Sequence, residues 1–160
     1  MSSSLTPRRT VLLGLLGLAG CGFAPIYGGG AGLRGRIAFE TDQSVVGFRL
    51  REQLEKRLGR SAAPQYMLKT TVRSSQRAAA ITSEGDTSRF NIVGVATWSL
   101  IALDSGTQVD GGEVEAFTSY SATGSTTATQ STRDDAEARV AAILADLIVS
   151  RVLILAAELT

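Results

Sequence analysis

Few side chains in this sequence could carry out chemistry. It contains one cysteine, Cys21, and no histidine. Disulfides, Cys/His zinc sites and catalysis through an imidazole base are therefore excluded. The acidic pair Asp134 and Asp135 falls where we expect a helix to begin, and carboxylates there interact favourably with the helix dipole. A serine–lysine hydrolase would need Lys56 or Lys69, and no supporting motif surrounds either, so we predict no catalytic site and no metal site.

Cys21 lies in a sequence typical of a lipid attachment site. Arg8 and Arg9 precede an uncharged run over residues 10–20, which ends in Leu18-Ala19-Gly20. A basic start, a short apolar centre and small residues at the exit are typical of an export signal, and the run is shorter than the ~20 apolar residues that span a bilayer. Residues 1–20 are thus predicted to be a lipoprotein signal peptide, removed as the Cys21 thiol is acylated. A plain secretory signal is the alternative, and the export route, general secretory or twin-arginine, stays open.

The remaining chain, 160 − 20 = 140 residues, fits one domain. Residues 21–35 are glycine-rich and predict a flexible tether, which leaves residues 36–160 as a single domain. Residues 34–89 carry 11 basic and 6 acidic side chains, whereas residues 90–160 carry 3 and 9. This asymmetry indicates either an anionic partner or two halves that pair with each other in the fold.

The hydrophobic pattern predicts an α+β domain. Alternation with a period of two predicts strands, and a period near 3.6 predicts helices. The order strand, helix, three strands, helix favours a two-layer sandwich, with two helices on one face of a largely antiparallel sheet of about four strands. The uncharged residues that follow Arg89 predict the central strand of this sheet. The expected elements are a strand at 36–40, a helix at 43–58, strands at 66–76, 89–103 and 112–122, and a helix from 132 to about 158.

The C-terminal helix is expected to follow a loop at residues 122–131. Thr132 and Asp135 approximate a capping box at its start, and Asp146 and Arg151 argue against a membrane span. Val149 and Leu153 lie on the side away from the predicted inward stripe, so we predict a partner interface there, with scattered surface apolarity as the alternative. The predicted inward stripe consists of Val140, Leu144, Leu147, Ile148 and Leu155.

Three local sequences resemble the outer-membrane lipopolysaccharide (LPS) assembly lipoproteins of the LptE type. They are Cys21-Gly22-Phe23-Ala24-Pro25-Ile26-Tyr27-Gly28, Phe48-Arg49-Leu50-Arg51-Glu52-Gln53-Leu54 and Thr87-Ser88-Arg89-Phe90. The resemblance implies a lipid-anchored, non-catalytic plug inside the β-barrel LPS translocon, which helps that barrel to fold and binds LPS. It implies no cofactor beyond the covalent lipid, no nucleic-acid partner, and localisation at the outer membrane after export to the periplasm. An accessory lipoprotein of another cell-envelope transport complex is the alternative.

Strand parity provides candidate LPS contacts. Lys69 and Arg73 fall on the face of the 66–76 strand opposite Leu68, Thr70 and Val72, and Arg77 continues their row if the strand extends that far. If the other face forms the core, these cations point outward together, where they can bind phosphate through charge-assisted hydrogen bonds. The alternative is that Glu113 and Glu115 on another strand pair with them.

Overall fold

A computed structural model describes residues 33–81, 87–122 and 125–158 and confirms the predicted α+β class and element order. The lipidation site Cys21, the signal peptide and most of the predicted tether lie outside these residues, so those assignments stay predictions. Strand β2 extends five residues beyond the predicted 66–76, whereas β3 matches the predicted 89–103 to within two residues at each end. The elements are β1 (Ile37–Thr41), α3 (Val45–Leu58), β2 (Tyr66–Ile81), β3 (Thr87–Ala102), β4 (Gln108–Ser121) and α4 (Thr126–Glu158).

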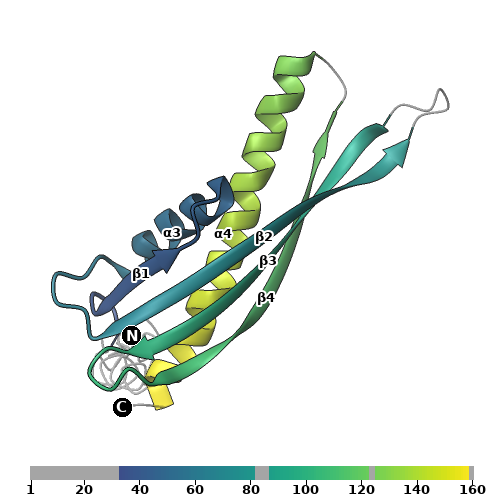
Figure 1. Ribbon diagram of the computed structural model, residues 1–160. Helices are drawn as coiled ribbons and strands as arrows, with labels where there is room; N and C mark the ends of the chain where they lie inside the picture. The colour runs from purple at the N-terminus through teal and green to yellow at the C-terminus, as the bar shows by residue number, and fades with distance from the viewer. Residues whose placement is uncertain (1–32, 82–86, 123–124, 159–160) are drawn as a thin grey trace, which may run out of the picture.

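The four strands form one sheet in the order β1-β2-β3-β4. β1 pairs with β2 in parallel through the α3 crossover, and the two later pairings are antiparallel. The predicted central strand, β3, is paired on both sides, with Val95 opposite Arg73 on β2 and Glu115 on β4. Both helices lie on the same side of the sheet (Figure 1).

The face of the sheet that lies under the helices, here called the covered face, holds the core. Leu68, Thr70 and Val72 are buried as their parity predicts, and Ile92, Ala96 and the other even-numbered core positions of β3 continue this face. The largest fully buried side chains of the described residues come from the strands and both helices: Ile37, Leu50, Leu54, Leu58, Leu68, Leu100, Val140, Leu144, Ile148 and Val152.

Helix α4 packs tightly on the sheet at Gly94. A Cβ atom at this position would lie 2.5 Å from Cγ1 of Val140 and 3.1 Å from Cδ1 of Leu144. The missing side chain therefore lets the helix approach the middle of β3. The core also includes Leu33, which is 4% exposed, and Gly35 N–H donates to the Leu58 carbonyl. Folded structure thus begins before residue 36, where we expected the domain to start.

The turn between β1 and α3 is organised by Asp42. Its carboxylate accepts hydrogen bonds from the N–H groups of Ser44 (2.9 Å) and Val72 (2.6 Å). Partial burial acts to raise the pKa of Asp42, but hydrogen bonds from Ser44 and Val72 outweigh it and hold the pKa below its ordinary value. Ser44 is the N-cap of α3, and its side chain accepts from Gly47 N–H. Asp42 therefore joins the start of α3 to β2.

Helix α4 begins at Thr126, six residues before the predicted start, so the expected loop over residues 122–131 is wrong. Ser125 provides the cap, because its Oγ accepts from Ala128 N–H and its carbonyl from Thr129 N–H. Thr132 lies inside the helix, where its hydroxyl contacts the carbonyls of Thr129 and Ser121.

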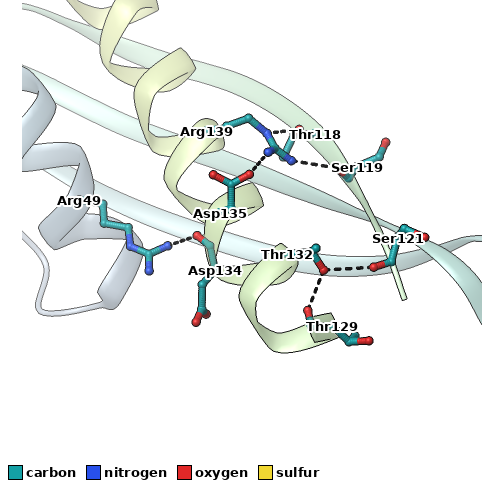
Figure 2. Close-up of polar contacts among 9 residues, drawn as sticks. All are labelled: Arg49, Thr118, Ser119, Ser121, Thr129, Thr132, Asp134, Asp135 and Arg139. Carbon is teal, nitrogen blue, oxygen red and sulfur yellow. Dashed lines mark hydrogen bonds and ion pairs between the residues drawn. The ribbon is translucent and has the colours of Figure 1, made fainter. Parts of the chain in front are cut away.

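The acidic pair Asp134 and Asp135 consequently lies within α4 and not at its start. Asp135 pairs with Arg139, and the Asp134 carbonyl accepts from Arg49 of α3 (Figure 2). The Asp134 side chain accepts from Gln130. Asp134 therefore joins α4 to α3, whereas Asp135 forms an ion pair within α4.

No helix in the described ranges is long and apolar enough to cross a membrane. Within the same ranges, no group of three or more Cys, Asp or Glu side chains is placed to hold a metal ion.

Candidate binding surface

The face of the sheet turned away from both helices, here called the open face, carries the predicted cations. Lys69, Arg73 and Arg77 are all exposed and follow one another at every fourth position of β2. Their outward direction follows from the burial of Leu68, Thr70 and Val72 on the covered face. Strand parity therefore located the row correctly, whereas its role in binding stays a prediction.

Two of the three cations already have acidic neighbours. Lys69 Nζ lies 3.3 Å from Glu40 Oε2 of β1, and Arg73 Nη2 lies 3.6 Å from Glu113 Oε2 of β4. The alternative prediction is thus confirmed for Arg73 and Glu113, whereas Glu115 pairs with neither cation. Exposed ion pairs of this kind contribute about 0–1 kcal/mol, so a phosphorylated ligand can replace the acidic partner at little cost.

Arg77 has no ion-pair partner among the described residues. It lies opposite Asn91 of β3, and the exposed Arg89 follows on the same face of that strand, opposite Ala80. Arg89 was missed as a site residue, although its odd-numbered position in β3 could have indicated it. Within the described residues, Arg77 and Arg89 place two cations without ion-pair partners at the β2–β3 end of the open face.

Three apolar side chains lie together in the middle of the open face, beside Glu115. Phe117 of β4 is 68% exposed and lies opposite Val93, and the half-buried Val95 is the next residue on this face. Arg73 lies across from Val95 on the other neighbouring strand. Cations therefore border an apolar strip, an arrangement that suits a ligand with anionic and apolar parts.

The predicted partner-interface residues lie elsewhere. Val149 and Leu153 are half-buried against the core and line a cavity of about 310 Å³. The expectation that they point away from the packed side is therefore wrong, and their role in an interface stays a prediction. The rest of the lining is Arg34, Arg57, Leu58, Asp146 and Ser150.

The error arises because the buried stripe winds around α4. Buried residues at intervals of four, from Val140 to Val152, advance about 40° per step around a helix with 3.6 residues per turn. By the later turns the stripe has reached Val149 and Leu153. Leu147, predicted to point inward, is left 39% exposed, with Ile143 at 40% and Ile154 at 59%.

The charge asymmetry between the two halves is partly used inside the fold. Arg49 Nη1 lies 3.7 Å from Glu137, Arg57 pairs with Asp146, and Arg73 pairs with Glu113. Each pair joins a cation from the first half to a carboxylate from the second. The prediction that the halves pair with each other is confirmed for these contacts, whereas Arg77 and Arg89 form no ion pair with any of the described residues.

Solved structures with this fold define a class of small bacterial lipoprotein domains. A candidate lipoprotein from Caulobacter crescentus CB15 is 25% identical, with a TM-score of 0.68 over 82% of this chain and 98% of the other. Rare lipoprotein B from Shewanella oneidensis is 10% identical, with a TM-score of 0.56 over 72% and 92% of the two chains. A minor lipoprotein from Acinetobacter baumannii is 14% identical, with a TM-score of 0.51 over 75% and 91%. The last two show the fold alone.

The sequence of residues 36–152 matches the family model LptE, described as lipopolysaccharide-assembly. No curated protein matches the chain. The family match spans most of the sequence, so the chain belongs to the LptE lipopolysaccharide-assembly family, as the three local sequences indicated.

Proposed function

We propose that this lipoprotein binds LPS on the open face of its sheet and assists the outer-membrane barrel that inserts LPS into the outer leaflet. Membership of a lipopolysaccharide-assembly family carries the proposal. We expect no catalysis from this role. The acylated Cys21 would hold the domain at the outer membrane, because each buried CH₂ of an acyl chain contributes about 0.8 kcal/mol to anchoring.

The cations of β2 support the LPS-binding part of the proposal. Lys69 and Arg73 engage exposed carboxylates, and Arg77 is free of them in the described part of the chain. A phosphate group can displace an exposed carboxylate and accept two parallel hydrogen bonds from one guanidinium. The neighbouring apolar strip around Phe117 suits the acyl chains of the same ligand.

A charge-matched pair of variants tests LPS binding. In the first, Lys69→Gln, Arg73→Gln and Arg77→Gln remove three cations from the open face. In the control, Arg34→Gln, Lys56→Gln and Arg60→Gln remove three exposed cations that lie off the sheet. We expect the first variant to bind purified LPS at least tenfold more weakly in detergent, and the control to bind like the wild type. Equal binding by both variants would remove the open face as the site.

Partner identity is tested separately by affinity purification of the full-length protein from solubilised envelopes. We expect an outer-membrane β-barrel to be the main copurifying protein. An ATP-driven transporter in its place would support the alternative role in another envelope transport complex. Crosslinking from Val149 and Leu153 in the same envelopes would show whether their cavity contacts that partner.

The lipid anchor requires its own test. The variant Cys21→Ser should abolish labelling with a fatty-acid probe and leave the signal peptide uncleaved by the lipoprotein pathway. Unchanged labelling would contradict the assignment of Cys21.

A further inference from the structure

The outer edge of β4 presents backbone groups that β3 does not use. Ala122 N–H donates to the Ser88 carbonyl (3.0 Å), which makes the neighbouring pair Arg89 and Ser121 a non-hydrogen-bonded pair. The N–H and C=O of Ser121 therefore point away from β3. The register is continuous back to Asp110, so the backbone groups of every second residue point the same way: Gly111, Glu113, Glu115, Phe117 and Ser119.

Both ends of this edge are capped by side chains. At one end, Asp110 Oδ1 accepts from Gly111 N–H (2.7 Å). At the other end, Arg139 Nη2 donates to the Ser119 carbonyl (3.1 Å) and Thr132 Oγ1 donates to the Ser121 carbonyl (3.1 Å), as Figure 2 shows. Caps of this kind block the pairing of a further strand.

The middle of the edge is left open. Within the described ranges, no side chain bonds to the outward N–H and C=O groups of Glu113, Glu115 or Phe117. These groups repeat every second residue, which is the spacing that an added strand matches. We call residues 113–117 the open edge.

Exposed apolar side chains border the open edge on both faces of the sheet. Phe117 borders the open edge on the open face of the sheet. On the other, Ile143 and Leu147 follow Arg139 at intervals of four residues, so they lie on the side of α4 that reaches β4. Because Thr132 contacts Ser121 and Arg139 contacts the earlier Ser119, the helix runs antiparallel to β4, which places Ile143 and Leu147 beside the open edge.

We propose that the open edge binds an extended segment of a partner protein, which adds to the sheet as a further strand beside β4. Its backbone would pair with Glu113, Glu115 and Phe117, and alternate side chains would pack on Ile143 and Leu147 or on Phe117. The inference deepens the proposed partnership with an outer-membrane protein and rests on it for the identity of the partner.

The negative charge of Glu115 indicates which kind of partner segment would bind at the open edge. Glu115 has no ion-pair partner among the described residues, so a Lys or Arg opposite it on the added strand would complete a cross-strand pair. A second copy of this chain fits poorly, because antiparallel pairing of two open edges about Glu115 puts like charges directly opposite each other.

Variants of the full-length acylated protein test the open edge. Glu115→Pro removes an outward N–H while the ladder to β3 stays intact, since proline is tolerated at such positions. Ile143→Asp places a charge beside the edge, and Phe48→Asp is the control, because Phe48 is 70% exposed on α3. We expect the first two variants to recover at least tenfold less barrel protein from solubilised envelopes, with unchanged melting temperatures, and the control to match the wild type. Equal recovery by Glu115→Pro and the wild type would overturn the inference.

Residue-resolved hydrogen exchange distinguishes strand addition from simple covering. In the purified complex, the N–H groups of Glu113, Glu115 and Phe117 should exchange at least 100-fold more slowly than in the protein alone, whereas those of Val114 and Ala116 should be slow in both. Fast exchange at the three outward groups with the barrel present rejects this inference and leaves the proposed function standing. If no barrel copurifies, the proposed function fails. Fast exchange of the same N–H groups in intact envelopes would then also reject the binding of an added strand at the open edge.

Discussion

The two faces of the sheet are formed by the same strands but carry different kinds of side chain. On the covered face, Leu68, Ile92 and Leu100 pack under α4 and α3 and are almost inaccessible to solvent. On the open face, the alternate residues include cations, carboxylates and the exposed Phe117. The covered face therefore determines stability, and the open face is free to serve binding.

The largest difference between the faces should appear when a large side chain is truncated. Leu144→Ala leaves a cavity under α4 and should lower the free energy of unfolding by about 2–5 kcal/mol. Phe117→Ala removes a larger side chain from the open face and should change it by about 0.5 kcal/mol or less. Urea denaturation of both variants measures the contrast, and similar losses would mean that the open face is covered within this chain.

Two glycines of the covered face test how closely α4 packs on it. Gly94→Ala places a Cβ 2.5 Å from Val140 Cγ1 and should cost about 1–3 kcal/mol, because a β-branched side chain cannot move aside. Gly112→Ala is the matched control, since its Cβ would meet its nearest neighbour, Trp98 Nε1, at 3.8 Å. Thermal unfolding should show a clear loss for the first variant only. A second substitution, Val140→Ala, should recover part of the loss at Gly94.

A carboxylate should contribute more when it binds backbone groups beside the core than when it forms a pair on the open face. Asp42→Asn loses an acceptor for Ser44 or Val72 N–H and should lower the unfolding free energy by about 1.5 kcal/mol at neutral pH. Glu40→Gln, which breaks the exposed pair with Lys69, should cost about 0.5 kcal/mol or less.

The contribution of Asp42 should also depend on pH. Because its folded-state pKa lies below the ordinary 3.8, the extra stability is present above that value and is lost as the pH falls through the folded-state pKa. Unfolding curves for the wild type and Asp42→Asn should therefore converge in acid. A constant difference from pH 7 to pH 2 would contradict this account.

The smallest effect concerns a polar group on the covered face. Thr70 is 4% exposed, and its hydroxyl has no hydrogen-bond partner among the described residues. Thr70→Val replaces the hydroxyl with a methyl group of similar size and should raise the unfolding free energy by about 1 kcal/mol. Chemical denaturation would detect the shift, and a loss of stability would indicate that the hydroxyl is hydrated in solution.

The sheet could be predicted from the sequence because its signal is local. Alternation along one strand was enough to assign Leu68 to the core and Lys69 to the surface. The start of α4 was missed although its cap, Ser125, is local, because the residues that follow it have no hydrophobic period and Thr132 docks on the Ser121 carbonyl of β4. The direction of Val149 and Leu153 was missed because the buried stripe winds around a long helix.

The dimensions of the domain give the cation row a further meaning. Helix α4 has 33 residues and is about 50 Å long at 1.5 Å per residue, and it runs the length of the sheet (Figure 1). From Lys69 to Arg77, eight residues of β2 cover about 26 Å, close to the ~30 Å hydrocarbon thickness of a bilayer. The three cations therefore form an extended line and not a pocket. If the sheet lies along the axis of the proposed barrel, an anionic head group would meet them one after another at successive depths of the membrane.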